Sequence, residues 1–238
     1  MTVNPVASAG FERGAGEYER ARPSYPAAVL DLLPSNGTII DVAAGTGKLT
    51  RMLPGDVVAI EPVAAMRSIA ATFAATVAGT AERLPLRDAC ADAVTVAQAF
   101  HWFDAPVALA EMARVLRPFG TLLLVWNERD KRVPWVIEMS RIIHAHDPNA
   151  YLHDIDWPST IAASGLFTPV ETVLVDNPQP GATRQLVVDR AASTSYIAAG
   201  PANVRDDVIR EVTAVVADLE EPFDFPYVTQ IFTCRRAC

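Results

Sequence analysis

The sequence TIIDVAAGTGKLTR (residues 38–51) places a glycine-containing loop directly after an apolar run. Its IIDV segment shows almost no alternation of apolar and polar residues, which is typical of a strand buried on both faces, as the central strands of a parallel sheet are. Residues 43–47 are then predicted to form a loop, and a helix is predicted to begin near Lys48. A glycine loop in this position brings backbone N–H groups close to a ligand.

The alternation of strand and helix continues along the chain. Further strands are predicted at residues 57–60, 78–79, 93–97, 121–126, 169–175 and 227–234, and helices at 26–33, 64–75, 106–116, 135–145, 159–164, 184–192 and 204–219. This order predicts an α/β fold, in which a parallel sheet carries helices on both faces and binds ligands at the carboxyl ends of its strands.

Composition narrows the class of protein. A chain of 238 residues that is 50% hydrophobic can bury a large core, and we expect a single domain over residues 1–238. The net charge of -8 and the pI of about 5.0 disfavour nucleic acid as a partner. No apolar run has the length of a signal peptide core or of a bilayer span, so we expect a cytoplasmic protein without a membrane partner. The oligomeric state stays open.

Two cofactor classes use such a loop. A dinucleotide would need glycine at the third position of GxGxxG, where counting from Gly45 gives Thr50. Asp41 would lie beside an anionic pyrophosphate but could meet a cationic amino group favourably. S-adenosylmethionine carries an ammonium and a sulfonium and no phosphate, so the loop favours it. Glu61, after the second strand, could accept hydrogen bonds from the ribose of either cofactor.

Five segments in matched order resemble one family. The segments IIDVAAGTG, AIEP, GTAERLPL, ADAVTVAQAFHWFD and EMARVLRPFGTLLLVW are similar to class I S-adenosylmethionine-dependent methyltransferases of the type 11 group, over roughly residues 36–126. YERARPSYP and QLVVDRAASTSYIAA resemble a bacterial branch often compared with trans-aconitate methyltransferase. The resemblance implies a Rossmann-like, mostly parallel seven-stranded sheet. Its last strand, here residues 227–234, would be antiparallel and form a hairpin with the strand before it.

The same resemblance implies S-adenosylmethionine as methyl donor, S-adenosylhomocysteine as product and a set of cofactor-binding residues. The methionine part is assigned to Asp41, Ala43, Gly45, Gly47, Gln98, Ala99 and Phe100, the ribose to Glu61 and Pro62, the adenine to Met66, Ala81 and Glu82, and closure over the site to Tyr18, Arg22 and Tyr25. Ala43 stands where glycine is usual, and it fits the loop if its backbone φ is negative. Thr80 stands where many relatives have an aspartate toward the adenine.

Methyl transfer from a sulfonium is an in-line displacement that needs a general base only when the acceptor must lose a proton. His101 follows the fourth strand and could be that base, or it could stack beside Trp102 or hydrogen-bond the loop. Arg129 follows the fifth strand and could bind an acceptor carboxylate, or it could form a surface ion pair with Asp130 or Glu128.

The segment HAHDPNAYLHDID has histidines and acids, but its spacing matches no zinc signature, so no metal is predicted and a polar lid is the better interpretation. The cysteines Cys90, Cys234 and Cys238 are interpreted as thiols without redox or metal function. Aromatic residues follow several strand ends and could belong to the core or line an apolar acceptor pocket. These aromatic residues are Trp102, Phe103, Trp126, Trp135 and Trp157.

The sequence therefore predicts methyl transfer from S-adenosylmethionine to a small-molecule acceptor, with a carboxylate as one candidate. Residues 1–35 are predicted to cap the cofactor, and 127–160 with 177–203 to form the acceptor-pocket lid. Two alternatives remain. One is a catalytically silent protein that binds S-adenosylmethionine, and the other, disfavoured by Asp41 and Thr50, is an NAD(P)-dependent oxidoreductase.

Overall fold

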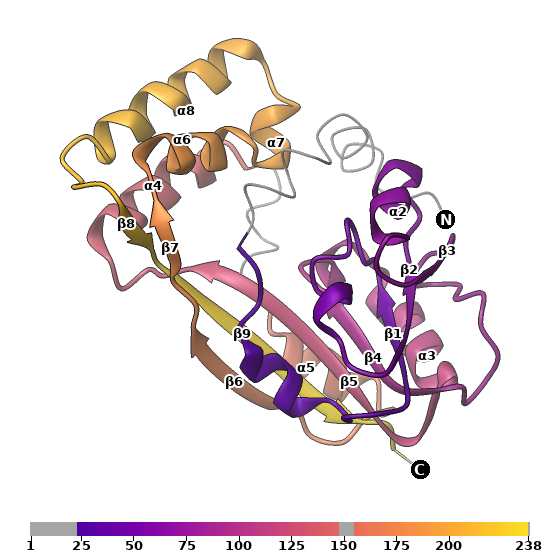
Figure 1. Ribbon diagram of the computed structural model, residues 1–238. Coiled ribbons are helices and arrows are strands. Elements are labelled where there is room, and N and C mark those ends of the chain that lie inside the picture. The colour runs from indigo at the N-terminus through magenta and orange to yellow at the C-terminus, as the bar shows by residue number, and fades with distance from the viewer. Residues whose placement is uncertain (1–22, 148–154, 238) are drawn as a thin grey trace.

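A seven-stranded sheet forms the centre of the molecule (Figure 1). The structure, a computed structural model, describes residues 23–147 and 155–237. The strands of the sheet are β1 (Thr38–Val42), β2 (Asp56–Ile60), β3 (Ala75–Val77), β4 (Ala91–Ala97), β5 (Leu116–Arg129), β6 (Glu171–Asp176) and β9 (Tyr227–Arg235). Their spatial order is β3-β2-β1-β4-β5-β9-β6.

The sheet is parallel from β3 to β5, and β9 runs antiparallel between β5 and β6. The predicted fold class, mostly parallel with an antiparallel last strand, is confirmed. The predicted hairpin is wrong, because residues 177–226 separate the paired strands β6 and β9. Strand order reverses between β1 and β4, so their carboxyl ends form the switch point at which open α/β sheets bind ligands.

Helices cover both faces of the sheet. One face packs against α3 (Ala105–Val115) and α5 (Trp157–Ala163), and the other against the 3-10 helices η1 (Ala27–Leu32) and η2 (Thr50–Met52). Consecutive residues of β1 show why the strand reads as a continuous apolar run: Ile40 belongs to the first core and Ile39 to the second, and neither is more than 1% exposed.

A second group of helices has its own core and lies at the carboxyl end of β5 (Figure 1). It comprises α4 (Pro134–His144), α6 (Arg184–Ala192), α7 (Ser195–Ala198), α8 (Ala202–Val215) and the strand pair β7 (Gln179–Ala182) and β8 (Phe223–Phe225). We call this group the helical lobe. Met139, Val187, Val208 and Phe225 meet in its core and are fully buried. The lobe contains α4 from the first expected lid segment and residues 179–203 from the second, together with α8, whereas α5 at the end of the first segment packs on the sheet instead.

Several boundaries differ from the sequence predictions. A helix was expected to begin near Lys48. Residues 45–49 form turns instead, and these end in the short 3-10 helix η2. The helix expected over 64–75 is α2 (Ala64–Ala70), and β3 lies at 75–77 instead of 78–79. Strands β7 and β8 and the 3-10 helix η3 (Phe100–Trp102) were not predicted.

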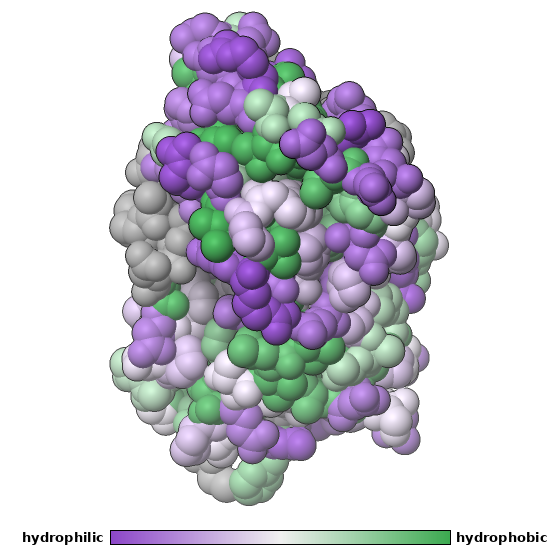
Figure 2. All heavy atoms as spheres, turned by 90° about the vertical axis from the view of Figure 1, so that its left-hand side faces the viewer, coloured by the Kyte–Doolittle hydropathy of each residue, from purple (hydrophilic) through white to green (hydrophobic). Residues whose placement is uncertain are grey.

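The outer edge of the sheet is the strand β6. Figure 2 shows a hydrophobic patch in the lower half of one face, at the height of this strand, and Leu174 of β6 is 63% exposed. In the parts of the chain that the structure describes, no helix is long and apolar enough to cross a bilayer.

Candidate functional site

The loop after β1 turns through left-handed backbone conformations. Ala43 has φ 54°, Gly45 has φ 59° and Gly47 has φ 83°. The expectation of a negative φ at Ala43 is therefore wrong. The chain must turn at once after the strand, so that the N–H of Ala44 donates to the carbonyl of Ile60 over 3.1 Å. An L-residue in this conformation costs about 1–2 kcal/mol, and such strain is typical of functional sites.

Glu61 lies at the end of β2 and faces this loop. Its side chain is buried, with 3% exposure, and its two oxygens accept hydrogen bonds from the N–H groups of Gly45 and Val63, each at 2.8 Å. Burial raises the pKa of Glu61 above its ordinary value, and the two backbone donors oppose that rise. Arg67 donates to the carbonyls of Glu61 and Pro62 and so orders the start of α2.

Asp41 lies behind the loop and not at its surface. One carboxylate oxygen accepts from Thr50 Oγ1 at 2.6 Å and the other from Thr95 Oγ1 at 2.9 Å, and the residue is 1% exposed. Burial raises the pKa of Asp41 from 3.8 to about 6, against the effect of the two hydroxyl donors. Sequence reasoning missed Thr95, although a threonine inside the buried run ADAVTVA is a usable signal for a buried polar contact.

The helix α2 packs closely on the loop. A side chain at Gly47 would meet the Phe73 ring at 3.1 Å and the Cα of Ala70 at 3.2 Å, so both its φ and its surroundings require glycine. A side chain at Gly45 would lie 3.9 Å from the sulfur of Met66, which is 4% exposed. Met66 thus contributes an apolar wall beside the loop.

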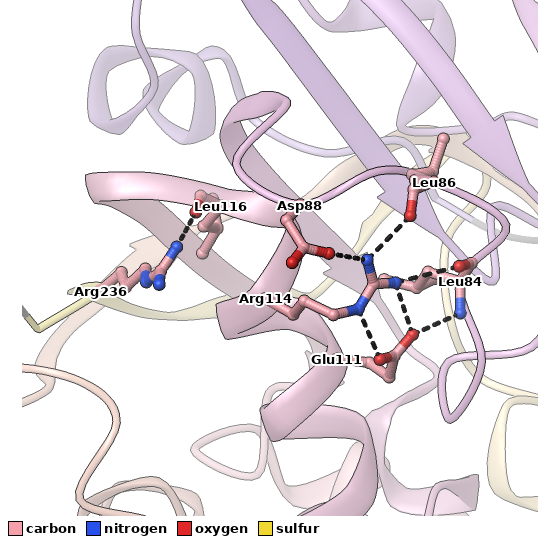
Figure 3. A network of polar contacts seen from close by, with 7 residues as sticks. All are labelled: Leu84, Leu86, Asp88, Glu111, Arg114, Leu116 and Arg236. Atoms are coloured by element: carbon pink, nitrogen blue, oxygen red, sulfur yellow. Dashed lines mark hydrogen bonds and ion pairs between the residues drawn. The ribbon is translucent and has the colours of Figure 1, made fainter.

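The segment expected to face the adenine is held by α3. Arg114 donates to the carbonyls of Leu84 and Leu86 at 3.1 and 2.8 Å, and it pairs with Asp88 and Glu111 (Figure 3). Glu111 in turn accepts from the N–H of Leu84 at 2.9 Å. Glu111 and Arg114 are three residues apart on α3, but their contacts with Leu84, Leu86 and Asp88 have no signal in the sequence, because those residues lie in a separate segment.

Ala81 and Glu82 lie just before the residues that Arg114 contacts, Leu84, Leu86 and Asp88. Ala81 is 3% exposed, and Glu82 accepts a 3.2 Å hydrogen bond from the N–H of Asp104, which precedes α3. Thr80, the position that departs from the family pattern, forms an isolated bridge with Arg83.

Gln98 directly follows β4 and, like Ala43, is a non-glycine residue in a left-handed conformation, with φ 59°. Its N–H donates to the carbonyl of Val125 at 2.9 Å, and its side-chain amide contacts the carbonyl of Asn127 at 3.4 Å. Ala99 and Phe100 are buried, and the Phe100 ring makes an edge contact with Trp157 at 5.3 Å. The residues at this strand end are therefore packed firmly enough to hold the strained backbone.

His101 lies on η3, directly after Phe100. Its ring centroid is 4.6 Å from that of Trp102 and the two ring planes are tilted by 48°, so the rings are in contact without a face-to-face stack. The other aromatic side chains expected to line a pocket or the core lie in cores: Trp126 stacks on Trp157 at 5.4 Å, and Trp135 contacts Phe225.

The N-terminal segment enters beside the end of β5. The side-chain amide of Asn127 donates to the carbonyl of Ser24 at 3.1 Å, and Asn177 donates to the same carbonyl at 2.8 Å. Thr229 donates to the Asn127 side chain at 2.6 Å and fixes its orientation. Tyr25 is 8% exposed and packs in the core around η1. Tyr18 and Arg22 lie outside the described residues.

Arg129, the last residue of β5, is partly buried, and its guanidinium lies 3.2 Å from Nε2 of His144. Asp130, one of its expected partners, pairs with Arg132 at 2.8 Å instead. Of the histidine and acid segment, His153 and Asp154 lie outside the described residues. Within residues 23–147 and 155–237 no group of three or more potential metal ligands occurs, and Cys90 and Cys234 are free.

Comparisons with known proteins agree with this geometry. A family described as Methyltransferase domain matches residues 40–124. An uncharacterized methyltransferase of Mycobacterium bovis is 42% identical over 97% of this chain and 96% of its own length. Among solved structures, an Anabaena variabilis protein assigned to the methyltransferases of an antibiotic biosynthesis pathway superposes with a TM-score of 0.64 at 20% identity, covering 86% of this chain and 94% of its own.

A second solved structure carries ligands. It is a phosphoethanolamine N-methyltransferase of Haemonchus contortus in complex with phosphomonomethylethanolamine and S-adenosylhomocysteine, with a TM-score of 0.62 at 13% identity, covering 100% of this chain and 61% of that one. At these identities the structures show the fold, whereas the Mycobacterium relative shows the family. The chain belongs to the class I S-adenosylmethionine-dependent methyltransferases, and S-adenosylmethionine is its cofactor.

Proposed function

We propose that this chain transfers the methyl group of S-adenosylmethionine to a small-molecule acceptor bound between the carboxyl ends of the strands and the helical lobe. The observation that carries the proposal is the joined pair of Gly45 and Glu61, in which a buried acid at the end of β2 faces the loop after β1. Each carboxylate oxygen holds one backbone donor and keeps a lone pair for a hydroxyl.

The residues around this pair fit the cofactor. Glu61 and Pro62 are proposed to hold the ribose, and Met66 with Ala81 and Glu82 to surround the adenine. The backbone of the loop and of residues 98–100 is proposed to hold the methionine part. Asp41 is proposed to support the binding of the methionine part indirectly. Its hydrogen bonds with the hydroxyls of Thr50 and Thr95 connect the strand before the loop to η2 and β4.

The chemistry that the chain must supply is modest. When bound, S-adenosylmethionine supplies a methyl group activated by its sulfonium. The chain positions an acceptor lone pair in line with that methyl group and excludes water, and His101 is proposed to accept a proton from acceptors that carry one. The resemblance to the trans-aconitate methyltransferase branch makes small carboxylic acids the first acceptors to test.

Calorimetric titration of the purified chain with S-adenosylmethionine, S-adenosylhomocysteine and a nicotinamide dinucleotide tests the proposal. We expect the first two to bind and the dinucleotide not to bind. Acceptors are then screened with methyl-labelled donor, carboxylic acids first. Binding without transfer to any acceptor would favour a silent cofactor-binding protein, and binding of the dinucleotide alone would contradict the assignment.

A further inference from the structure

A buried arginine in the helical lobe has no negative partner. Arg190 on α6 is 6% exposed, and its Nε donates to the hydroxyl of Tyr227 at 2.9 Å. Its Nη1 is fully buried and has no hydrogen-bond partner within the described part of the chain. Burial of an uncompensated guanidinium is strongly unfavourable unless something pairs with it, so an orphan donor of this kind indicates a ligand.

A second arginine lies beside the same tyrosine. Arg129 of β5 is the register partner of Tyr227 in β9, and the Arg190 guanidinium lies 5.8 Å from the Tyr227 ring centroid. The pKa of Arg129 is lowered mainly by burial, with the positive charge of Arg190 as a further cause. The two guanidinium groups are therefore close enough to repel each other.

Among the described residues, the nearby acids form no ion pair with these arginines, although the charge of Glu128, next to Arg129, partly opposes the repulsion. The Arg129 guanidinium lies 3.2 Å from Nε2 of His144, and an imidazole brings no negative charge to it. The carboxylate of Asp189, next to Arg190, accepts a hydrogen bond from the side-chain amide of Gln185. Asp130 forms an ion pair with Arg132. Across residues 23–147 and 155–237, neither Arg129 nor Arg190 forms an ion pair with a carboxylate.

We propose that Arg129 and Arg190 together bind an anionic group of the methyl acceptor, a carboxylate or a phosphate, at the junction of β5, β9 and the helical lobe. This inference rests on the proposed function. Each guanidinium carries N–H donors in a planar, fork-like arrangement that matches the oxygen pairs of such groups. Arg129 supplies one such fork from the sheet, and Arg190 supplies the other from α6. The binding of an anion would satisfy Nη1 of Arg190 and relieve the repulsion.

The place of this pair suits an acceptor. Arg129 is two residues beyond Asn127 on the same strand, and the carbonyl of Asn127 contacts the strained Gln98 at the end of β4. Residues two apart on a strand point to the same side and lie about 7 Å apart. The anion site would thus lie on the same edge of the sheet as the methionine-binding residues.

The wild-type chain, saturated with S-adenosylhomocysteine, is titrated calorimetrically with citrate, inorganic phosphate and neutral glycerol at constant ionic strength. We expect citrate, phosphate or both to bind and glycerol not to bind. Binding of citrate alone assigns the site to carboxylates, and binding of phosphate alone assigns it to phosphoryl groups. If neither anion binds more tightly than glycerol, the inference is wrong.

Variants locate the site. Arg190→Met and Arg129→Met should each weaken anion binding by at least about tenfold, since each removes one fork from a desolvated ion pair. Arg210→Gln, on the exposed surface of α8, is the control and should bind as wild type does. Arg190→Met should melt no lower than wild type without anion, because an unpaired buried charge is gone. Undiminished anion binding by Arg190→Met would contradict the inference.

Two readouts separate this inference from the proposed function. S-adenosylhomocysteine binding reports on the cofactor site, and it should stay within about twofold in every variant. With an anionic acceptor, Arg190→Lys should raise KM more than it lowers kcat, because lysine keeps the charge and loses the fork. If Arg190→Met does not fold, the wild-type titration and the Arg190→Lys variant still test whether the anion site exists. Failure of the wild type to bind S-adenosylhomocysteine would remove the proposed function, and the anion titration of the chain without S-adenosylhomocysteine would then test the anion site by itself.

Discussion

The N–H of Gly45 donates a 2.8 Å hydrogen bond to the carboxylate of Glu61 and so joins the loop after β1 to the end of β2. The contact forms although the two residues follow different strands, because β1 and β2 are parallel and their carboxyl ends lie side by side. It fixes where the acid points before any ligand arrives. Preorganisation of this kind reduces what binding has to order.

Replacement of Glu61 by glutamine should weaken S-adenosylhomocysteine binding by about 10- to 100-fold. The amide turns one acceptor into a donor, so it loses either the Gly45 contact or a ribose hydroxyl, at about 1.5–3 kcal/mol for a hydrogen bond to a charged group. Calorimetric titration measures the loss, and Glu171→Gln on the exposed face of β6 is the matched control. Equal affinity in Glu61→Gln and wild type would remove Glu61 from the site.

The strain at Ala43 predicts an unusual stabilising substitution. Ala43→Gly should raise the free energy of unfolding by about 0.5–1 kcal/mol, because relief of the left-handed strain outweighs the added flexibility of the unfolded chain. Ala44→Gly, one residue further on and without a positive φ, should lower it by a similar amount. Urea unfolding of the pair checks the sign, and destabilisation by Ala43→Gly would show that the loop is not strained.

The order of strands and helices could be predicted because buried parallel strands leave an unbroken apolar run, as in IIDV and TLLLVW. Asp41 and Glu61 could be predicted from the same pattern, because Asp41 is the first polar residue within one apolar run and Glu61 the first polar residue after another. The sign of φ at Ala43 could not be predicted. It is set by the hydrogen bond between Ala44, in the loop after β1, and Ile60, at the end of β2.

Arg190 shows a second limit of sequence reasoning. In QLVVDRAASTS it has the spacing of an ordinary helix residue, and a lone arginine on a helix is most simply a solvated side chain. What makes it unusual is its burial against Tyr227, which is 37 residues away and on the central sheet. The helices between β6 and β9 were predicted at 184–192 and 204–219, and only the hairpin implied by the family resemblance was wrong, since pairing in a sheet places no limit on the length of the segment between two strands.

Asp41 should make stability depend on pH. Its pKa rises from 3.8 to about 6 in the fold, so the native state holds the proton more tightly than the unfolded chain. Its contribution to stability therefore falls as pH rises from about 4 to 6, by roughly 3 kcal/mol, and stays low above that range. Asp41→Asn should flatten this part of the profile and be more stable than wild type at pH 7.5. Urea unfolding at pH 4.5, 6 and 7.5 tests it; an unchanged slope would contradict the role of Asp41.

The contacts of Arg114 predict a coupling between α3 and the adenine segment. Arg114→Lys should lower stability by about 1–3 kcal/mol and weaken S-adenosylhomocysteine binding several-fold, because the carbonyls of Leu84 and Leu86 lose a shared donor. Hydrogen exchange of residues 80–88 should become faster. Arg141→Lys, in an exposed pair with Glu138, is the control and should change stability by less than about 0.5 kcal/mol. Unchanged exchange in Arg114→Lys would show that the segment is held by other contacts.

A pair of substitutions separates the two roles of His101. His101→Ala removes both the proton acceptor and the ring that contacts Trp102 at 4.6 Å, whereas His101→Phe keeps a ring in that place. If His101 is a base, both variants should lose about 10²–10⁴-fold in turnover with acceptors that must lose a proton, while S-adenosylhomocysteine affinity stays within about twofold. Acceptors that are already carboxylate anions should lose far less, because they have no proton to give up. Recovery of turnover in His101→Phe would mean that the ring acts by contact with Trp102, and His101 would then leave the mechanism.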